Sequence, residues 1–374
     1  MPNPDKPRVL VVDDHPDVLE ALRLLLKGGG YAADTALNPR QALELAGKAE
    51  HVAVLIDMNY ERDTTSGAEG LALLEALRAS HPETPVIVMT AWGSIELAVE
   101  AMRRGAADFI PKPWENQRVL EAIQRQTQRR DEMSLARRVQ RRLLPPSTGT
   151  APGVEYACVF RPAGEVGGDL WSVFATRTGT AFMLGDIAGK GTGAALMMAS
   201  LQATIRGNED LAAEPGRLAT RANRLFFRAT APEHFATIFL GHFEPSTGEL
   251  RYVNCGHPAP VLIQGEGSTL QRPTLQCPTL QRLEATSLVL GAFEHAEAAE
   301  AVITLGPGAR LVAFSDGVSE ATRRGEVHGD DDRWVAEFIH RLVQTGSPGL
   351  AEELAMAAVS DDDVTVLDLR FIAN

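Results

Sequence analysis

The first 114 residues alternate short apolar runs with amphipathic segments, a pattern typical of a sheet covered by helices on both faces. The apolar runs that indicate buried parallel strands lie at 8–12, 52–56 and 85–89, with shorter ones at 31–35 and 108–110. The segments with a helical spacing of apolar residues lie at 16–27, 66–80 and 94–105. This order predicts a doubly wound α/β domain of the flavodoxin-like kind over residues 1–118, whose chemistry should gather where the strands end.

Residues 115–146 follow a different pattern, in which polar residues dominate and Pro145 and Pro146 close the segment. Because proline cannot continue a helix, the segment is predicted to be one long helix that stops there. Its apolar residues lie at both ends and leave a polar middle, so a sustained coiled-coil heptad is absent. We expect the part from 119 to 146 to be a linker helix.

The pattern changes again in residues 147–374, where short strands and turn signals dominate. The stretch "EPSTGEL" at 244–250 separates two alternating runs and predicts a hairpin. Helical patterns lie at 190–206, 214–229 and 334–344. This arrangement predicts an α+β domain with a mostly antiparallel sheet and helices on its faces.

Composition adds constraints on the partners of the protein. The 374 residues are 44% hydrophobic and 23% charged, with three widely separated cysteines and no apolar run long enough to span a membrane. The net charge is −13, although the segment 115–146 carries eight arginines against four acidic residues. Two acidic bodies disfavour nucleic acid as a partner, and the basic strip fits a solvated helix face better than an anion or RNA site. We expect a cytoplasmic protein that binds neither nucleic acid nor membrane.

Polar residues follow the expected strands of the first domain at one edge of its sheet. They are Asp13, Asp14, Asp57, Thr90 and Lys112. A single acid in such a place is usually a helix cap, but five polar residues that converge on one edge are hard to explain by capping.

With these residues at these positions, the segment resembles the receiver domain of a two-component response regulator over its whole length. The resemblance implies that Asp57 accepts a phosphoryl group from a sensor histidine kinase. It also implies that Asp13, Asp14 and Asp57, helped by the backbone carbonyl of Asn59, hold Mg²⁺. This chemistry needs a cation, because a carboxylate attacks phosphorus only when the crowded negative charge is neutralised.

The same resemblance assigns the remaining receiver residues to a switch. Thr90 and Lys112 grip the phosphoryl oxygens, Phe109 matches the aromatic residue that reorients with Thr90, and the bond from Lys112 to Pro113 is expected to be cis. The loop after Asp57 is longer than in many receivers, so the resemblance does not predict which partner this loop contacts.

The stretch "GDIAGKG", which contains Gly185, Gly189 and Lys190, first suggests a phosphate-binding loop. The P-loop pattern needs four residues between its first glycine and the Gly-Lys pair, followed by Ser or Thr; here the two glycines are separated by three residues and Lys190 is followed by Gly191. The nucleotide interpretation therefore fails on spacing. The alternative is that Asp186 serves a metal ion and Lys190 faces solvent.

Four acids of the last domain lie beside strand ends or glycines: Asp169, Asp186, Asp316 and Asp362. A set of carboxylates without thiols or a clear histidine group favours Mg²⁺ or Mn²⁺ over zinc. One "DG" by itself usually marks a turn, so only the set carries the interpretation.

Together with "VGGD", "NCGHPAP", "FSDGVSEA" and "DDVTVL", these acids resemble the PPM family of metal-dependent protein serine/threonine phosphatases, in its SpoIIE-like bacterial branch. The resemblance implies a β-sandwich flanked by helices and two Mn²⁺ or Mg²⁺ ions. It places the metal ligands at Asp169, Asp186, Asp316 and Asp362, with the carbonyl of Ile187 and, in possible support, Asp363. Asp186 would bridge the two ions. His257 in "NCGHPAP" fits a turn-stabilising residue better than a general acid.

The combined interpretation is a response regulator whose aspartyl phosphorylation controls a metal-dependent phosphoprotein phosphatase. The resemblance implies a phosphorylated STAS-type anti-sigma-factor antagonist as the substrate. The linker helix allows pairing with a second chain as a homodimer. The alternative is an adaptor with a catalytically silent phosphatase domain that delivers a sigma factor or another client. Retention of all four acids argues against the adaptor.

Overall fold

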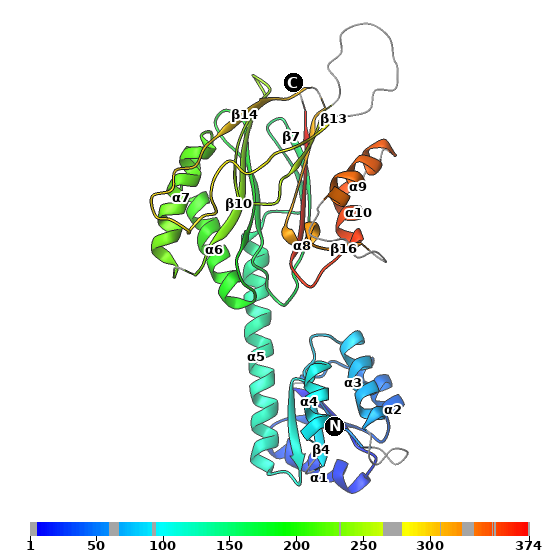
Figure 1. The fold of residues 1–374 in the computed structure, drawn as a ribbon. Coiled ribbons are helices and arrows are strands. Elements are labelled where there is room, and N and C mark those ends of the chain that lie inside the picture. The colour runs from blue at the N-terminus through cyan, green and yellow to red at the C-terminus, as the bar shows by residue number, and fades with distance from the viewer. Residues whose placement is uncertain are drawn as a thin grey trace. The chain divides into compact units, whose positions relative to one another are not determined.

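The computed structural model describes residues 6–59, 67–91, 95–231, 233–264, 279–306, 308–323, 333–345, 347 and 349–372. Most of the long loop after Asp57, and most of the proline-containing run at 270–283, lie outside the described residues. Contacts between Cα atoms divide the chain into two compact bodies, Met1–Leu135 and Ala136–Asn374 (Figure 1).

The N-terminal body is the doubly wound α/β domain that the apolar pattern predicts. Its elements are β1 (Arg8–Val12), α1 (Pro16–Gly28), β2 (Ala32–Ala36), α2 (Pro39–Ala46), β3 (Ala53–Asp57), α3 (Ala68–Ser80), β4 (Val86–Ala91), α4 (Ile95–Arg103), β5 (Asp108–Lys112) and α5 (Asn116–Leu143). The strands are parallel in the order β2-β1-β3-β4-β5. Helix α2 was missed from the sequence. It is short, and local signals fix its start: Pro39 is at its first turn and the side chain of Asn38 accepts a hydrogen bond from the Gln41 N–H.

Alternate residues of the central strands enter two separate apolar layers. Leu10 and Ile56 pack with α3 and α4, whereas Val9 and Leu55 pack with α1 and α5. Because successive side chains of a strand point to opposite faces, both faces of the sheet are covered and the five strand ends meet at one edge.

Helix α5 continues past the end of this body as one unbroken helix of 28 residues. Its first turns belong to the receiver core, where Val119 and Ile123 are fully buried. Further along, Leu135, Val139 and Leu143 form a stripe of exposed apolar side chains with a spacing of four residues.

The C-terminal body holds two large sheets and a two-stranded one, formed by β16 (Thr322–Arg323) and β17 (Ala358–Val359). The described strand pairs are all antiparallel (Figure 1). The first sheet has the order β14-β11-β10-β9-β8 and contains β8 (Leu170–Ala175), β9 (Thr180–Ile187), β10 (Ala236–Glu244), β11 (Glu249–Cys255) and β14 (Ala301–Thr304). The second sheet has the order β13-β12-β15-β18-β7-β6 and contains β6 (Thr148–Ala151), β7 (Val154–Arg161), β12 (Val261–Gln264), β13 (Thr279–Arg282), β15 (Arg310–Phe314) and β18 (Val364–Phe371). The hairpin predicted at 244–250 joins β10 to β11.

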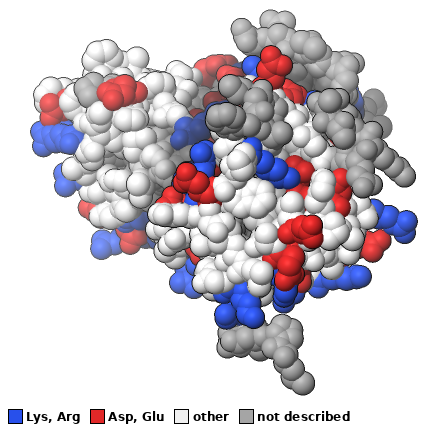
Figure 2. All heavy atoms as spheres, turned by 90° about the horizontal axis from the view of Figure 1, so that it is seen from below, with Lys and Arg blue, Asp and Glu red and all other residues white. Residues whose placement is uncertain are grey.

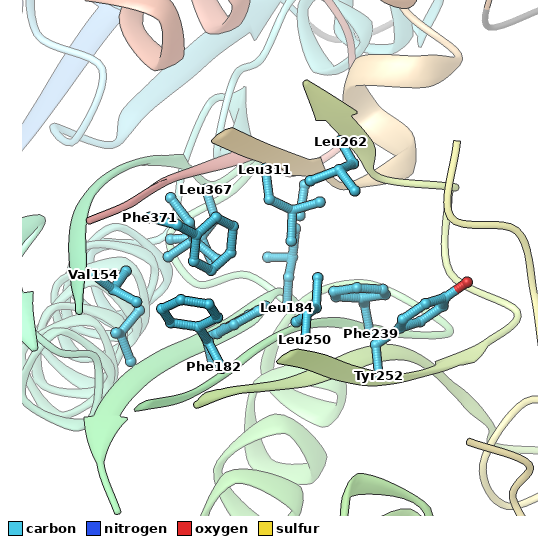
Figure 3. Packing of buried hydrophobic residues seen from close by; sticks show 14 of the residues in the cluster. Val154, Phe182, Leu184, Phe239, Leu250, Tyr252, Leu262, Leu311, Leu367 and Phe371 are labelled. Atoms are coloured by element: carbon cyan, nitrogen blue, oxygen red, sulfur yellow. The ribbon is translucent and has the colours of Figure 1, made fainter. Parts of the chain in front are cut away.

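Helices cover the outer faces of both sheets. Helices α6 (Thr192–Arg206) and α7 (Pro215–Ala229) pack on the first sheet, and α9 (Arg333–Gln344) and α10 (Leu350–Ala357) pack on the second. The sandwich interior is filled by large side chains from both sheets, among them Phe182, Phe239 and Leu367 (Figure 3). This is the predicted β-sandwich flanked by helices; α10 was not predicted from the sequence.

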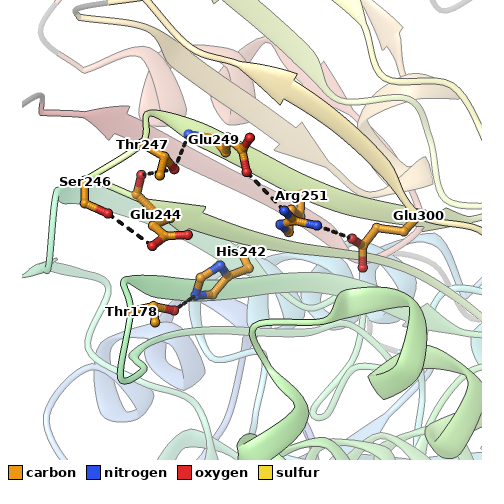
Figure 4. Close-up of polar contacts among 8 residues, drawn as sticks. All are labelled: Thr178, His242, Glu244, Ser246, Thr247, Glu249, Arg251 and Glu300. Atoms are coloured by element: carbon orange, nitrogen blue, oxygen red, sulfur yellow. Dashed lines mark hydrogen bonds and ion pairs between the residues drawn. The ribbon is translucent and has the colours of Figure 1, made fainter.

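Several polar side chains form hydrogen bonds and ion pairs near the turn of the β10–β11 hairpin (Figure 4). The ring of His242 contacts the hydroxyl of Thr176 at 2.9 Å, and Arg251 bridges Glu249 and Glu300 at 3.1 and 3.3 Å. In the ladder, His242 pairs with Ala181, five residues before Asp186 on β9. These contacts are therefore structural and lie away from the acids of the first sheet.

Two cysteines of the C-terminal body, Cys158 on β7 and Cys255 on β11, are buried as free thiols. Burial raises the pKa of both thiols, that of Cys255 to about 12.

Among the described residues visible in Figure 2, Lys and Arg side chains are interspersed with Asp and Glu side chains. Within the described residues, the helices are all too short or too polar to cross a bilayer.

Candidate functional site

The receiver residues predicted from the sequence meet at the edge of the parallel sheet where its strands end. Asp13 follows β1, Asp57 ends β3 and Lys112 ends β5. The Lys112 ammonium lies 2.9 Å from Oδ2 of Asp57 and 2.7 Å from Oδ2 of Asp13. Asp13 and Asp57 are both buried, at 0% and 4% exposure.

Burial raises the pKa of the Asp57 carboxyl, and the Lys112 ammonium opposes that rise. Oδ1 of Asp57 is buried without a hydrogen-bond partner. Ligand atoms of Asp13, Asp14 and His15 lie within 4.8 Å of one another. An orphaned carboxylate oxygen beside further carboxylates fits a hard divalent cation. His15 was not among the residues predicted from the sequence; its Nδ1 lies 3.2 Å from Asp13 and 2.8 Å from Asp14.

The proposed switch residues lie on the last two strands. Thr90 on β4 is buried at 3% exposure, whereas Phe109 on β5 is 39% exposed. The Lys112–Pro113 bond is cis, as expected.

The four acids of the C-terminal body meet at one end of the sandwich, two from each sheet. Asp169 precedes β8 and Asp186 lies near the end of β9; Leu170 and Gly185 are ladder partners, so these two acids are neighbours. Asp316 starts the short helix α8 (Asp316–Ser319) after β15, and Asp362 precedes β18. Because the paired strands of both sheets end here, residues nearly 200 positions apart come together.

Burial and mutual repulsion raise the pKa values of the carboxyl groups in this cluster. Burial, together with the charge of Asp316, raises the pKa of Asp186 to about 7. Burial also raises the pKa of Asp169 well above its usual range, and Asp186 adds to that rise. The pKa of Asp316 is raised by burial and by Asp362. Carboxylates crowded in this way need protons or cations to compensate their charge.

The surroundings of these acids are suited to metal ions. Oδ1 of Asp169 is buried without a hydrogen-bond partner. A Cβ atom on Gly168 would lie 3.1 Å from the carbonyl oxygen of Ile187 and 3.3 Å from Oδ1 of Asp186, so a larger residue here would press on both oxygens. Among the described residues, Asp13, Asp14 and His15 have ligand atoms that all lie within 4.8 Å of one another, and the four acids of the C-terminal body form no group as compact as this.

Asp363 has a different environment from the other acids. Its Oδ1 accepts a hydrogen bond from the Ala163 N–H at 2.7 Å, and its Oδ2 accepts one from the Gly168 N–H at 2.6 Å. Both oxygens are thus engaged with the loop that carries Asp169. Sequence reasoning missed Thr365, whose hydroxyl donates to Oδ2 of Asp169 and so joins the two sheets.

Two residues outside the acid set also contact the site. Lys190 is exposed, as expected, but its ammonium forms an ion pair with Asp362 at 2.9 Å. His257 is buried and stabilises its turn as predicted: its N–H donates to the side chain of Asn254 at 2.8 Å. Its ring also contacts the hydroxyl of Thr237 at 2.9 Å, the ladder partner of Asp186. Burial lowers the pKa of His257 to about 3.

Comparison with known families identifies the two domains that carry these sites. The family described as Stage II sporulation protein E (SpoIIE) matches residues 176–372, more than half of the chain. The chain belongs to the SpoIIE family. The match covers three of the four acids, and Asp169 lies just before it. Residues 9–124 match the response regulator receiver domain, so this SpoIIE protein carries a receiver at its N-terminal side.

Similar proteins among response regulators support the receiver of this SpoIIE chain. The nitrogen assimilation regulatory protein NtrX of Azorhizobium caulinodans is 36% identical over 118 residues, which are 31% of this chain and 25% of that protein. The transcriptional regulator NtrC of Escherichia coli is 35% identical over 162 residues, or 42% and 32% of the two chains. The chain thus spans about a quarter to a third of these relatives.

A solved structure matches the other body. The SiaA-PP2C domain of Pseudomonas aeruginosa superposes with a TM-score of 0.53 at 18% identity, covering 66% of this chain and 98% of that one. At this identity the match shows the fold alone, a β-sandwich flanked by helices.

The raised pKa of Asp186 has a consequence for the stability of the metal-free protein. Its carboxyl keeps a proton up to about pH 7 in the folded chain but only up to about pH 3.8 when unfolded, so stability falls as pH rises between these values. Asp186→Asn removes this loss. We expect metal-free Asp186→Asn to exceed the wild type in free energy of unfolding by a few kcal/mol at pH 7.5 and to match it near pH 4, measured by urea unfolding in EDTA. A difference that is the same at both pH values would contradict this.

Proposed function

We propose that this protein is a phosphorylation-controlled, metal-dependent phosphoprotein phosphatase that acts on phosphoserine or phosphothreonine. The observation that carries the proposal is the cluster of four carboxylates from both sheets, buried or half-buried and short of compensating cations. Such a cluster costs folding free energy, which a purely structural site would not keep.

In this proposal, the side chains of the cluster bind the metal ions, and neighbouring residues hold those side chains in place. Asp169, Asp186, Asp316 and Asp362, with the carbonyl of Ile187, would supply oxygen ligands. The bound ions would activate a water and neutralise the phosphoryl oxygens during an in-line displacement. Asp363 and Thr365 hold the loop and the carboxylate of Asp169 in place. Lys190, paired with Asp362 and exposed, is free to turn toward an incoming phosphate.

The receiver would supply the control. Asp57 would take a phosphoryl group from a histidine kinase, with Asp13, Asp14 and the Asn59 carbonyl holding Mg²⁺. Lys112 already lies at 2.9 Å from the accepting carboxylate and would pair with the new phosphate. The substrate we propose is a phosphorylated STAS-type anti-sigma-factor antagonist, as is common in the SpoIIE-like branch. The exposed stripe of Leu135, Val139 and Leu143 suits pairing of two chains through α5.

The alternative is an adaptor with a silent phosphatase domain that binds a sigma factor or another client. An adaptor would not need buried acids that repel each other, so we favour the enzyme.

The test is phosphate release from a phosphoserine-containing STAS protein with Mn²⁺, with and without acetyl phosphate. We expect release that depends on Mn²⁺ and changes several-fold when Asp57 is phosphorylated. A phosphothreonine peptide and a phosphotyrosine peptide serve as substrate controls. No release from any substrate at saturating Mn²⁺, together with tight binding of the unmodified STAS protein or a sigma factor, would favour the adaptor.

A further inference from the structure

One side chain near the end of α5 is buried although the helix around it is mostly exposed. Gln140 is 5% exposed, whereas its neighbour Val139 is 50% exposed. The Nε2 of Gln140 donates to the carbonyl oxygen of Gly167 at 2.6 Å, and its Oε1 accepts from the Gly167 N–H at 3.2 Å. The side-chain amide thus pairs with one backbone residue in both directions, as a neighbouring strand would.

The residue held in this way is two positions before a proposed metal ligand. Gly168 follows: its N–H donates to Oδ2 of Asp363, and a Cβ atom here would lie 3.1 Å from the carbonyl oxygen of Ile187. Asp169 comes next; it is fully buried, and its carboxylate accepts a hydrogen bond from the hydroxyl of Thr365. Three successive residues are therefore held by three side chains: Gln140 on α5, Asp363 directly before β18, and Thr365 on β18.

We infer that Gln140 is a positioning residue of the metal site: it fixes the Gly167–Asp169 loop and so sets where the Asp169 carboxylate lies. The inference rests on the proposed metal-dependent function. Because the amide sits on α5, a small shift of that helix would move the loop. Hydrogen-bond partners in the outer shell of a metal site typically contribute about 10–100-fold to metal affinity.

If Gln140 only anchored α5, its loss would affect Mn²⁺ binding no more than the loss of another buried glutamine that anchors this helix. The chain offers two such glutamines as matched controls. Gln202 on α6 is equally buried and donates to the Leu143 carbonyl at 2.8 Å, so it anchors the end of α5 without contacting the loop. Gln126 on α5 is buried in the receiver body, where it donates to the Ala107 carbonyl at 3.1 Å.

The test compares Gln140→Met, Gln202→Met and Gln126→Met in the full chain. Mn²⁺ binding is measured by calorimetry, and binding to Asp186→Asn is subtracted to remove the receiver site. We expect Gln140→Met to weaken Mn²⁺ binding at least about 10-fold, and both controls to stay within about 2-fold. Hydrogen exchange without metal should be faster in residues 163–169 of Gln140→Met alone, which separates the loop from general unfolding.

Equal Mn²⁺ affinity of Gln140→Met and wild type, or an equal loss in Gln202→Met, would overturn the positioning role and leave the proposed function standing. If the wild type binds no more Mn²⁺ than Asp186→Asn, the metal site itself is refuted, and the inference with it.

Discussion

Asp186→Asn and Asp316→Asn should each reduce phosphate release by about 10³-fold or more, because each variant removes an oxygen ligand from a site that needs two ions. Loss of one ion forfeits several kcal/mol of charge stabilisation in the transition state, and each 1.36 kcal/mol is tenfold in rate. The measurement is the turnover of the phosphoprotein at saturating Mn²⁺. Circular dichroism and thermal unfolding should show both variants folded, since neither side chain belongs to an apolar core.

Asp361→Asn is the matched control, because Asp361 adjoins Asp362 in the sequence but is exposed. It should retain turnover within about 2-fold, since its side chain is outside the proposed ligand set. Undiminished turnover of Asp186→Asn or Asp316→Asn would exclude the two-ion assignment and favour the adaptor.

Asp57→Ala should abolish phosphoryl uptake from acetyl phosphate and leave phosphatase activity at its unstimulated level. Asp57 is the carboxylate that ends β3 beside the Lys112 ammonium, and Lys112 keeps its second partner, Asp13, in the variant. The domain should therefore stay folded. The measurement is incorporation of labelled phosphate on a bond that is labile to both acid and base.

Asp17→Ala, which removes an exposed acid from the first turn of α1, should incorporate label as the wild type does. Label that persists in Asp57→Ala would show that the phosphorylation site has been misplaced.

The fold classes could be predicted from the sequence, because apolar runs mark buried strands. Most candidate site residues could be proposed as well, because the acids lie beside the ends of those runs. Asp13, Asp57 and Lys112 could be placed at one edge because parallel strands end together. The pairing of Asp169 with Asp186 follows from an antiparallel ladder, whose register depends on contacts across the whole sheet.

Other contacts had no local signal. The partner of Gln140, the backbone of Gly167, lies 27 positions along the chain, and Thr365 contacts Asp169 over 196 positions. Asp363 was expected near the ions, but which backbone groups face its oxygens depends on the path of the loop at 163–168. Lys190 was expected to face solvent; it does, yet the chain also brings Asp362 within reach of its ammonium.

The two buried cysteines affect how the C-terminal body responds to oxidants. Peroxide and disulfides react with the thiolate, and the fraction of thiolate at neutral pH falls tenfold for each unit by which the pKa rises. Burial raises the pKa of both Cys158 and Cys255 and also limits access to their sulfur atoms. Cys158 and Cys255 should therefore react slowly with oxidants, so we expect both sulfur atoms to stay reduced while a cell is under oxidative stress.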